Sequence, residues 1–170
     1  MKLDIEQLHK MHPALPPTTA DSYAHRAALA LGRRHAPGVV AGVLLDAQLL
    51  RATLSWKDRP AADALQLDYH RVTEDGAEAV ALALVHASRS WVVLRRLQRE
   101  EHADWLLRET TTRRLVALEV SGTDEGDSDA RLSVKLAQVA QSRVARTRAA
   151  CVVGFLEPRI ALTIAREVSR

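Results

Sequence analysis

The chain has 170 residues, of which 47% are hydrophobic and 26% charged, and its formal net charge is +3. These proportions are typical of a soluble globular protein, and no apolar run approaches the length of a membrane span. We therefore expect a single domain over residues 1–170 that does not enter a membrane. Because the first residues lack the apolar core of a signal peptide, we expect a cytoplasmic location.

The N-terminal part, residues 1–60, predicts a helical and hairpin elaboration of the domain. A proline-rich break, HPALPPTT, precedes an expected helix over Ser22–Arg34. Two β-like runs, Gly38–Asp46 and Gln48–Trp56, then predict a hairpin, although their leucine content leaves a helix open.

Histidine and cysteine chemistry is not expected in this chain. His9 and His12 could share a helix face, but Pro13 follows them and no third ligand is near, so two solvated side chains are expected rather than zinc. The single cysteine, Cys151, excludes an intrachain disulfide, and its apolar surroundings predict a small buried side chain.

The core of the domain is expected over residues 71–157, with short polar connections between successive elements. It comprises a helix beginning with Thr73 as its cap, three strands, a second helix and a fourth strand: Arg71–Ala87, Ser90–Leu97, Ala103–Arg108, Arg113–Ser121, Asp129–Arg146 and Ala149–Leu156. A further segment, Ile160–Val168, closes the chain. The order predicts an α/β (α+β) fold, with a mixed central β-sheet flanked by helices.

A carboxylate interrupts the most apolar of these strands. Strand side chains alternate, so Glu119 and Ser121 share one face of Arg113–Ser121, among aliphatic residues on both faces. Burying a charge is costly unless a partner compensates it. Asp104 lies at the start of the preceding strand, so the two carboxylates can meet across neighbouring strands, and such a pair predicts a Mg²⁺ site.

Two helices carry side chains that could complete this site. Glu78 lies within the apolar face of the first core helix and is expected to be partly buried. On the second core helix, Lys135 and Gln138 belong to a polar stripe with helical spacing, alongside Arg131 and Ser142. Lys135 could therefore reach toward Glu119.

These residues resemble the PD-(D/E)xK nuclease superfamily, which has the restriction-endonuclease-like fold, over roughly the C-terminal hundred residues. In the resemblance, Asp104 and Glu119 are the metal ligands, and Glu78 is the helical glutamate that many members add. Ser121 stands where the family has its lysine, so this chain departs from the pattern there. Some members carry that lysine on a neighbouring helix, which makes Lys135 the candidate, and Gln138 resembles a helical glutamine of some branches.

The resemblance implies an endonuclease that hydrolyses DNA phosphodiester bonds with Mg²⁺ or Mn²⁺, with Glu78, Asp104, Glu119, Ser121, Lys135 and Gln138 as its catalytic residues. It also implies DNA as a partner, and a homodimer or larger complex for cutting both strands of a duplex. The segment Arg89–Arg99 interleaves arginines with apolar residues and could contact a phosphate backbone, or simply form an exposed strand face.

Other interpretations remain open. Glu119 could be a structural carboxylate paired with Arg95 or Arg96, and Asp104 could simply begin a strand. The chain could be a catalytically degenerate nuclease fold that serves as a DNA-binding or assembly subunit. It could also be an interaction protein, such as a chaperone-like or immunity factor, in which the carboxylates form only ion pairs.

Overall fold

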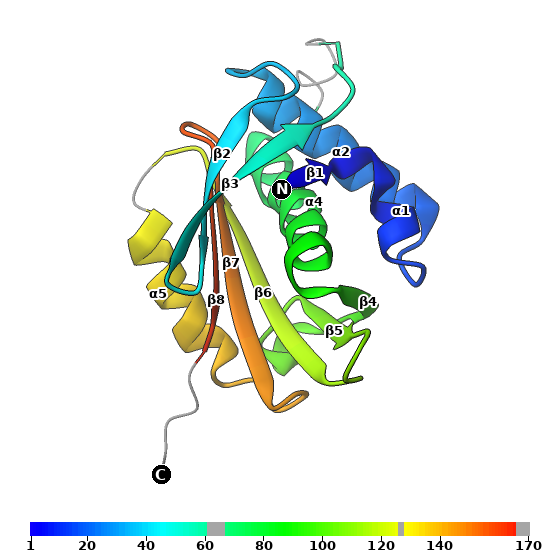
Figure 1. The fold of residues 1–170 in the computed structure, drawn as a ribbon, viewed down its shortest axis with the longest axis vertical. Coiled ribbons are helices and arrows are strands. Elements are labelled where there is room, and N and C mark those ends of the chain that lie inside the picture. Colours follow the sequence, from blue (N-terminus) through cyan, green and yellow to red (C-terminus); the bar gives the residue numbers. More distant parts are fainter. Residues whose placement is uncertain (61–66, 126–127, 166–170) are drawn as a thin grey trace.

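The computed structural model describes residues 1–60, 67–125 and 128–165. Within them, eight strands form one sheet in the order β1-β3-β2-β8-β7-β6-β5-β4 (Figure 1). The strands are β1 (Lys2–Asp4), β2 (Val40–Leu45), β3 (Gln48–Ser55), β4 (Trp91–Arg96), β5 (Trp105–Glu109), β6 (Leu115–Thr123), β7 (Thr147–Gly154) and β8 (Arg159–Ile164). The helices are α1 (Leu8–Met11), α2 (Pro17–Gly32), α4 (Tyr69–Arg89) and α5 (Ser128–Val139), with short 3-10 turns at Ile5–Gln7 and Arg99–Glu101.

The strand directions confirm the expected mixed sheet flanked by helices. Strands β4, β5 and β6 form an antiparallel meander, and β6 continues through α5 into β7, which lies parallel to it. Strand β8 then pairs antiparallel with β7 and parallel with β2. The N-terminal hairpin β2–β3 therefore extends the same sheet, and β1 adds a parallel edge strand.

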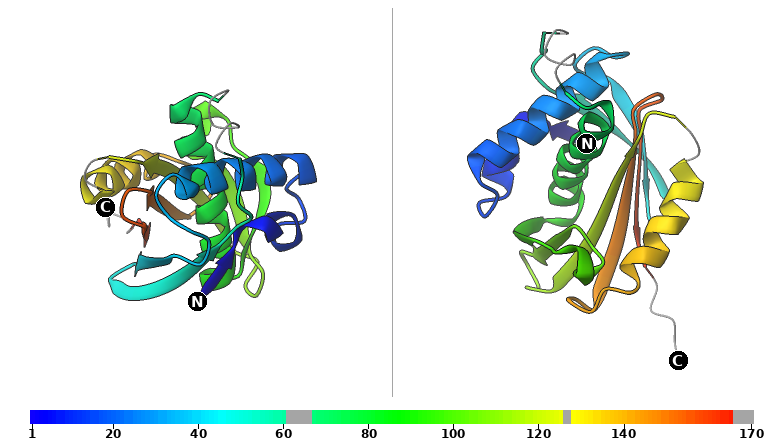
Figure 2. Two further views of the ribbon diagram at one scale, coloured as in Figure 1. Left: turned by 90° about the horizontal axis from the view of Figure 1, so that it is seen from above. Right: turned by 180° about the vertical axis from the view of Figure 1, so that it is seen from behind.

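Helices cover the two faces of the sheet unequally (Figure 2). Helix α4 packs on β6 and β7, and α2 packs on α4, so this side holds the larger core. The contact between the two helices is close, since a Cβ at Gly76 would lie 3.1 Å from the Cα of Ala27. Helix α5 alone covers β6, β7 and β8 on the other face. No helix in the described ranges has the length and apolar character needed to cross a membrane.

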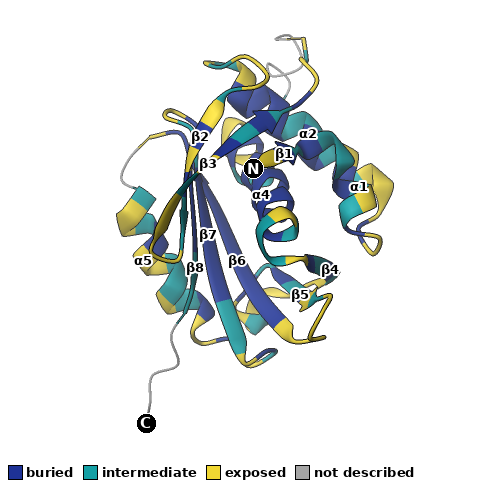
Figure 3. Ribbon diagram, viewed as in Figure 1, coloured by how far each residue is buried: buried dark blue, intermediate teal, exposed yellow. Residues whose placement is uncertain are grey.

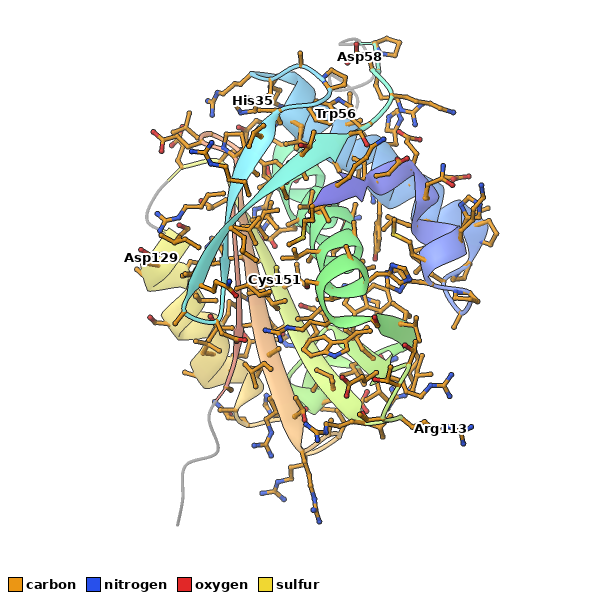
Figure 4. The ribbon with its side chains drawn as sticks, in the orientation of Figure 1. His35, Trp56, Asp58, Arg113, Asp129 and Cys151 are labelled. Atoms are coloured by element: carbon orange, nitrogen blue, oxygen red, sulfur yellow. The ribbon has the colours of Figure 1, made fainter. Side chains whose placement is uncertain are left out.

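The middle of β6 and β7 is buried on both faces (Figure 3). Cys151, labelled in Figure 4, lies in this part of β7 and is fully buried, as expected. Burial raises the pKa of its thiol, which makes it an inert core side chain. The three tryptophans are also buried in the larger core.

Several element boundaries differ from the expected ones. Asp68 caps α4 by accepting from the backbone N–H of Arg71 at 2.9 Å, whereas Thr73 is buried inside the helix. Helix α5 ends at Val139 rather than Arg146. The closing segment forms strand β8 over Arg159–Ile164, and its last residues lie outside the described ranges. The sequence analysis did not predict strand β1 at the N-terminus.

His12 is fully buried, so the expectation of a solvated side chain was wrong. Its Nδ1 accepts from the backbone N–H of Val93 at 3.2 Å, which leaves Nε2 to donate to the carbonyl of Leu82 at 3.1 Å. The pKa of His12 is lowered to about 4, chiefly by burial and in part by His86, whose ring centroid is 5.6 Å away. The neutral ring thus ties the N-terminal segment to α4 and β4.

The His12 contacts predict an acid-sensitive stability. Between pH 6.5 and pH 4 the unfolded chain protonates this histidine and the folded chain does not, so the free energy of unfolding falls by about 3 kcal/mol. Chemical denaturation of the parent and of His12→Gln at several pH values checks this. The parent should lose stability relative to the variant as the pH falls, and a difference independent of pH would contradict the assignment.

Candidate functional site

Strand β6 runs further than its neighbour β5. Their pairing ends where Trp105 lies opposite Leu118, although Asp104 still donates its backbone N–H to the carbonyl of Leu118 at 2.9 Å. Beyond that point, the N–H groups of Val120 and Gly122 have no strand partner on the β5 side. Buried backbone donors must be satisfied, and here two carboxylates do so. Asp104 Oδ2 accepts from Val120 at 2.8 Å, and Glu74 Oε2 accepts from Gly122 at 3.1 Å.

This arrangement brings Asp104 and Glu119 together. Asp104 follows the register of the β5–β6 pair and lies beside Glu119, which is only 3% exposed. Burial raises the pKa of Glu119, and the adjacent negative charge of Asp104 raises it further, whereas Lys135 opposes the shift. Two carboxylates in such a position repel each other unless positive charge lies nearby.

Lys135 supplies that charge from α5. Its Nζ lies 2.6 Å from Oε1 of Glu119 and 3.3 Å from Oε1 of Gln138, one helical turn away. Lys135 therefore lies at the end of the Glu119 side chain, as expected, and Gln138 contacts Lys135 from the next turn of the helix. The alternative partners are engaged elsewhere, because Arg95 binds Glu101 and Arg96 binds Glu78.

Glu78 lies in a separate buried position, linked to Asp104 through Arg96. Its Oε2 accepts from the indole N–H of Trp105, and its Oε1 lies 3.3 Å from Nη2 of Arg96. The same Nη2 is 3.9 Å from Oδ1 of Asp104, and Arg96 also donates to the hydroxyl of Tyr23. Burial raises the pKa of Glu78 to about 8, with the charge of Asp104 as the second cause. Arg96 is thus a second cation of this site.

Ser121, at the position of the family lysine, is turned toward a different cluster. It is 2% exposed, and its hydroxyl donates to Oε1 of Glu74 at 3.4 Å. Arg131 lies 3.7 Å from the same Glu74 oxygen and donates to the carbonyl of Gly122. Ser142, the last member of the expected polar stripe, lies beyond the end of α5, and its carbonyl accepts from Arg148 at 2.7 Å.

The residues present fit a divalent cation held by two carboxylates. Asp104 and Glu119 each keep one oxygen that accepts neither from a backbone N–H nor from Lys135. Mg²⁺ in proteins is often bound by one or two carboxylates together with substrate phosphate and water. In the part of the chain that the structure describes, no group of three or more His, Cys, Asp or Glu side chains converges on one point, so the protein would supply only this pair.

Comparisons with protein-family models, with curated proteins and with solved structures found no match to this chain. The site is therefore defined by its own geometry.

The sequence analysis did not identify two features of this region. One is Glu74, and the other is the pairing of Arg96 with Glu78. The sequence analysis gives Glu74 no role in the site. Its spacing of four residues from Glu78 places both on one face of α4, and that spacing was an available signal. No local pattern could have indicated that Arg96 bridges Glu78 and Asp104, because the three residues come from different elements.

Gly122 sets how closely α4 approaches β6. A Cβ at this position would overlap the carbonyl oxygen of Thr73, which is backbone and cannot move aside. We expect Gly122→Ala to lower the free energy of unfolding by about 2 kcal/mol, the usual cost of overpacking. Gly42→Ala is the matched control, because nothing lies within 4 Å of the added methyl group on β2. Equal stabilities for the two variants in urea denaturation would contradict the close contact.

Proposed function

We propose that this protein is a Mg²⁺-dependent nuclease that hydrolyses DNA phosphodiester bonds, with the restriction-endonuclease-like fold in its core. The observation that carries the proposal is that Asp104, Glu119 and Lys135 lie together where β6 extends beyond the end of β5. The order α4, β4, β5, β6, α5, β7, with β6 parallel to β7, also agrees with the helix, three strands, helix and strand of that fold.

In this proposal each side chain has a distinct role. Asp104 and Glu119 would hold the cation, which would lower the pKa of a bound water and stabilise the negative charge that develops on the phosphate. Lys135 takes the place of the motif lysine, because its ammonium already lies at the Glu119 carboxylate. There it can orient the attacking water and donate a hydrogen bond to a phosphate oxygen. Gln138 holds the lysine in place, and Glu78 keeps Arg96 beside Asp104.

Ser121 cannot perform the lysine's role. A hydroxyl supplies no positive charge, and this one donates to Glu74 rather than to Asp104 or Glu119. Activity therefore depends on Lys135.

A second candidate function is a catalytically degenerate nuclease fold that acts as a DNA-binding or assembly subunit. One observation favours it: Lys135 already neutralises Glu119 in an ion pair, so the carboxylates have a counter-charge without a metal. The two candidates differ in whether a divalent cation can displace the ammonium from Glu119.

The direct test is cleavage of plasmid and single-stranded DNA with Mg²⁺ or Mn²⁺. We expect Glu119→Gln to abolish cleavage, since the amide neither ligates the cation well nor keeps the negative charge. Glu100→Gln, at an exposed position, is the matched control and should cut as the parent does. Cleavage that survives Glu119→Gln would show that the activity arises elsewhere.

Lys135→Met separates metal binding from catalysis. Removing the ammonium leaves the buried Glu119 and the half-buried Asp104 without that counter-charge, so Mn²⁺ should bind about tenfold more tightly. Cleavage should fall by about 10² or more, because the group that orients water and phosphate is lost. Calorimetry with Mn²⁺ and a cleavage assay measure the two effects, with Lys10→Met, at an exposed position, as control. Unchanged or weaker Mn²⁺ binding would mean that the lysine and the cation do not share Glu119.

A further inference from the structure

An arginine-rich groove lies at the end of the sheet where β6 and β7 begin. It has a volume of about 420 Å³, and its lining includes Arg114, Arg143, Arg146, Arg148, Leu115 and Val144, with no acidic side chain among the residues that line it. The arginines come from the start of β6, from the segment after α5 and from the start of β7. Arg113, labelled in Figure 4, projects from the same end of the molecule. The net charge of only +3 is therefore unevenly distributed.

Three of the four arginines that line this groove do not help to hold the fold together. Within the described ranges, the side chains of Arg114, Arg143 and Arg146 make no ion pair or hydrogen bond, and all three residues are exposed. Arg148 uses only its Nε, to donate to the carbonyl of Ser142. Like charges gathered without counter-charges repel one another, so this groove is an electrostatic cost to the folded chain.

The segment Arg89–Arg99, in contrast, is largely neutralised. Arg89 pairs with Asp46, Arg95 with Glu101, and Arg96 with Glu78. The unpaired guanidinium groups of the arginine groove therefore lie away from the segment that the sequence indicated.

The arginine groove and the carboxylate site lie on the same face of the sheet but are not continuous. In the parallel pair β6–β7, Arg148 lies beside Ala117 and Ala150 lies beside Glu119. Side chains in register point to the same face of a sheet, so Arg148 is on the face of Glu119, about 7 Å nearer the start of the strands. Ala117 and Ala150 are fully buried in the core beneath α5, so the groove is a surface separate from the pair Asp104 and Glu119.

We infer that the arginine groove binds the phosphate groups of a nucleic-acid backbone. Guanidinium groups bind phosphate through two parallel hydrogen bonds, and several unpaired arginines in one groove can contact more than one phosphate. Leu115, which is 39% exposed, and Val144 provide an apolar wall for a sugar or a base. The binding itself needs neither metal nor cleavage, so it does not rest on the proposed function.

The test measures binding in EDTA, where no cleavage occurs. The anisotropy of a fluorescein-labelled 20-nucleotide single strand reports affinity over a range of salt concentrations. The double variant Arg143→Ala/Arg146→Ala should bind about tenfold more weakly, and its salt slope should fall by about 1.4 for the two lost phosphate contacts. Both residues are exposed, so the fold should be kept. Arg51→Ala, at an exposed position on β3, is the matched control and should bind as the parent does.

Two results would overturn the inference. One is equal affinity and salt slope for the double variant and the Arg51→Ala control. The other is competition by poly-glutamate as effective as that of unlabelled oligonucleotide at equal charge, which would assign the groove to an acidic protein instead. Loss of binding in the double variant supports the groove even if the parent never cleaves DNA. Conversely, cleavage that depends on Glu119 supports the nuclease even if the double variant binds normally.

Discussion

The arrangement of charged side chains in this protein depends on one mismatch of length, because β6 continues after β5 has ended. The backbone donors of Val120 and Gly122 are left without a strand partner inside the molecule, and such donors cannot remain unpaired there. Asp104 and Glu74 supply the missing acceptors. Each brings a negative charge into a poorly solvated region. The carboxylates that satisfy the backbone donors therefore need positively charged side chains nearby.

The cations follow from that requirement. Lys135 approaches from α5 on one side of the sheet, and Arg96 approaches from β4 near α4 on the other. Arg131 serves Glu74 in the same way. Asp104 stays partly exposed at this edge, whereas Glu119 is buried. The feature that completes backbone hydrogen bonding is therefore also the one that gathers the charges of the candidate site.

The part of this site that was predictable from sequence is the part encoded by local periodicity. Glu119 could be identified from the sequence because a carboxylate within an apolar strand needs a partner. Lys135 could be identified because its spacing from Gln138 places both on one helix face, and the structure shows the corresponding contacts. The order of the core elements followed from their patterns and short connections. The partners of Glu78 and the burial of His12 depend on which distant segments meet in space. The sequence did not indicate the arginine groove, because its residues come from three separate segments of ordinary composition.

Helix α5 carries Lys135 but contributes little to the core. Its buried residues are Leu132 and Val139, whereas most residues in the middle of α4 are buried. Elements with few buried apolar contacts open at lower free energy than the rest of a domain. Detachment of α5 would withdraw the ammonium and leave the carboxylates on the intact sheet. The net charge at the site therefore depends on whether α5 is docked on the sheet. A change of temperature or a binding partner can shift this docking equilibrium under conditions in which the rest of the domain stays folded.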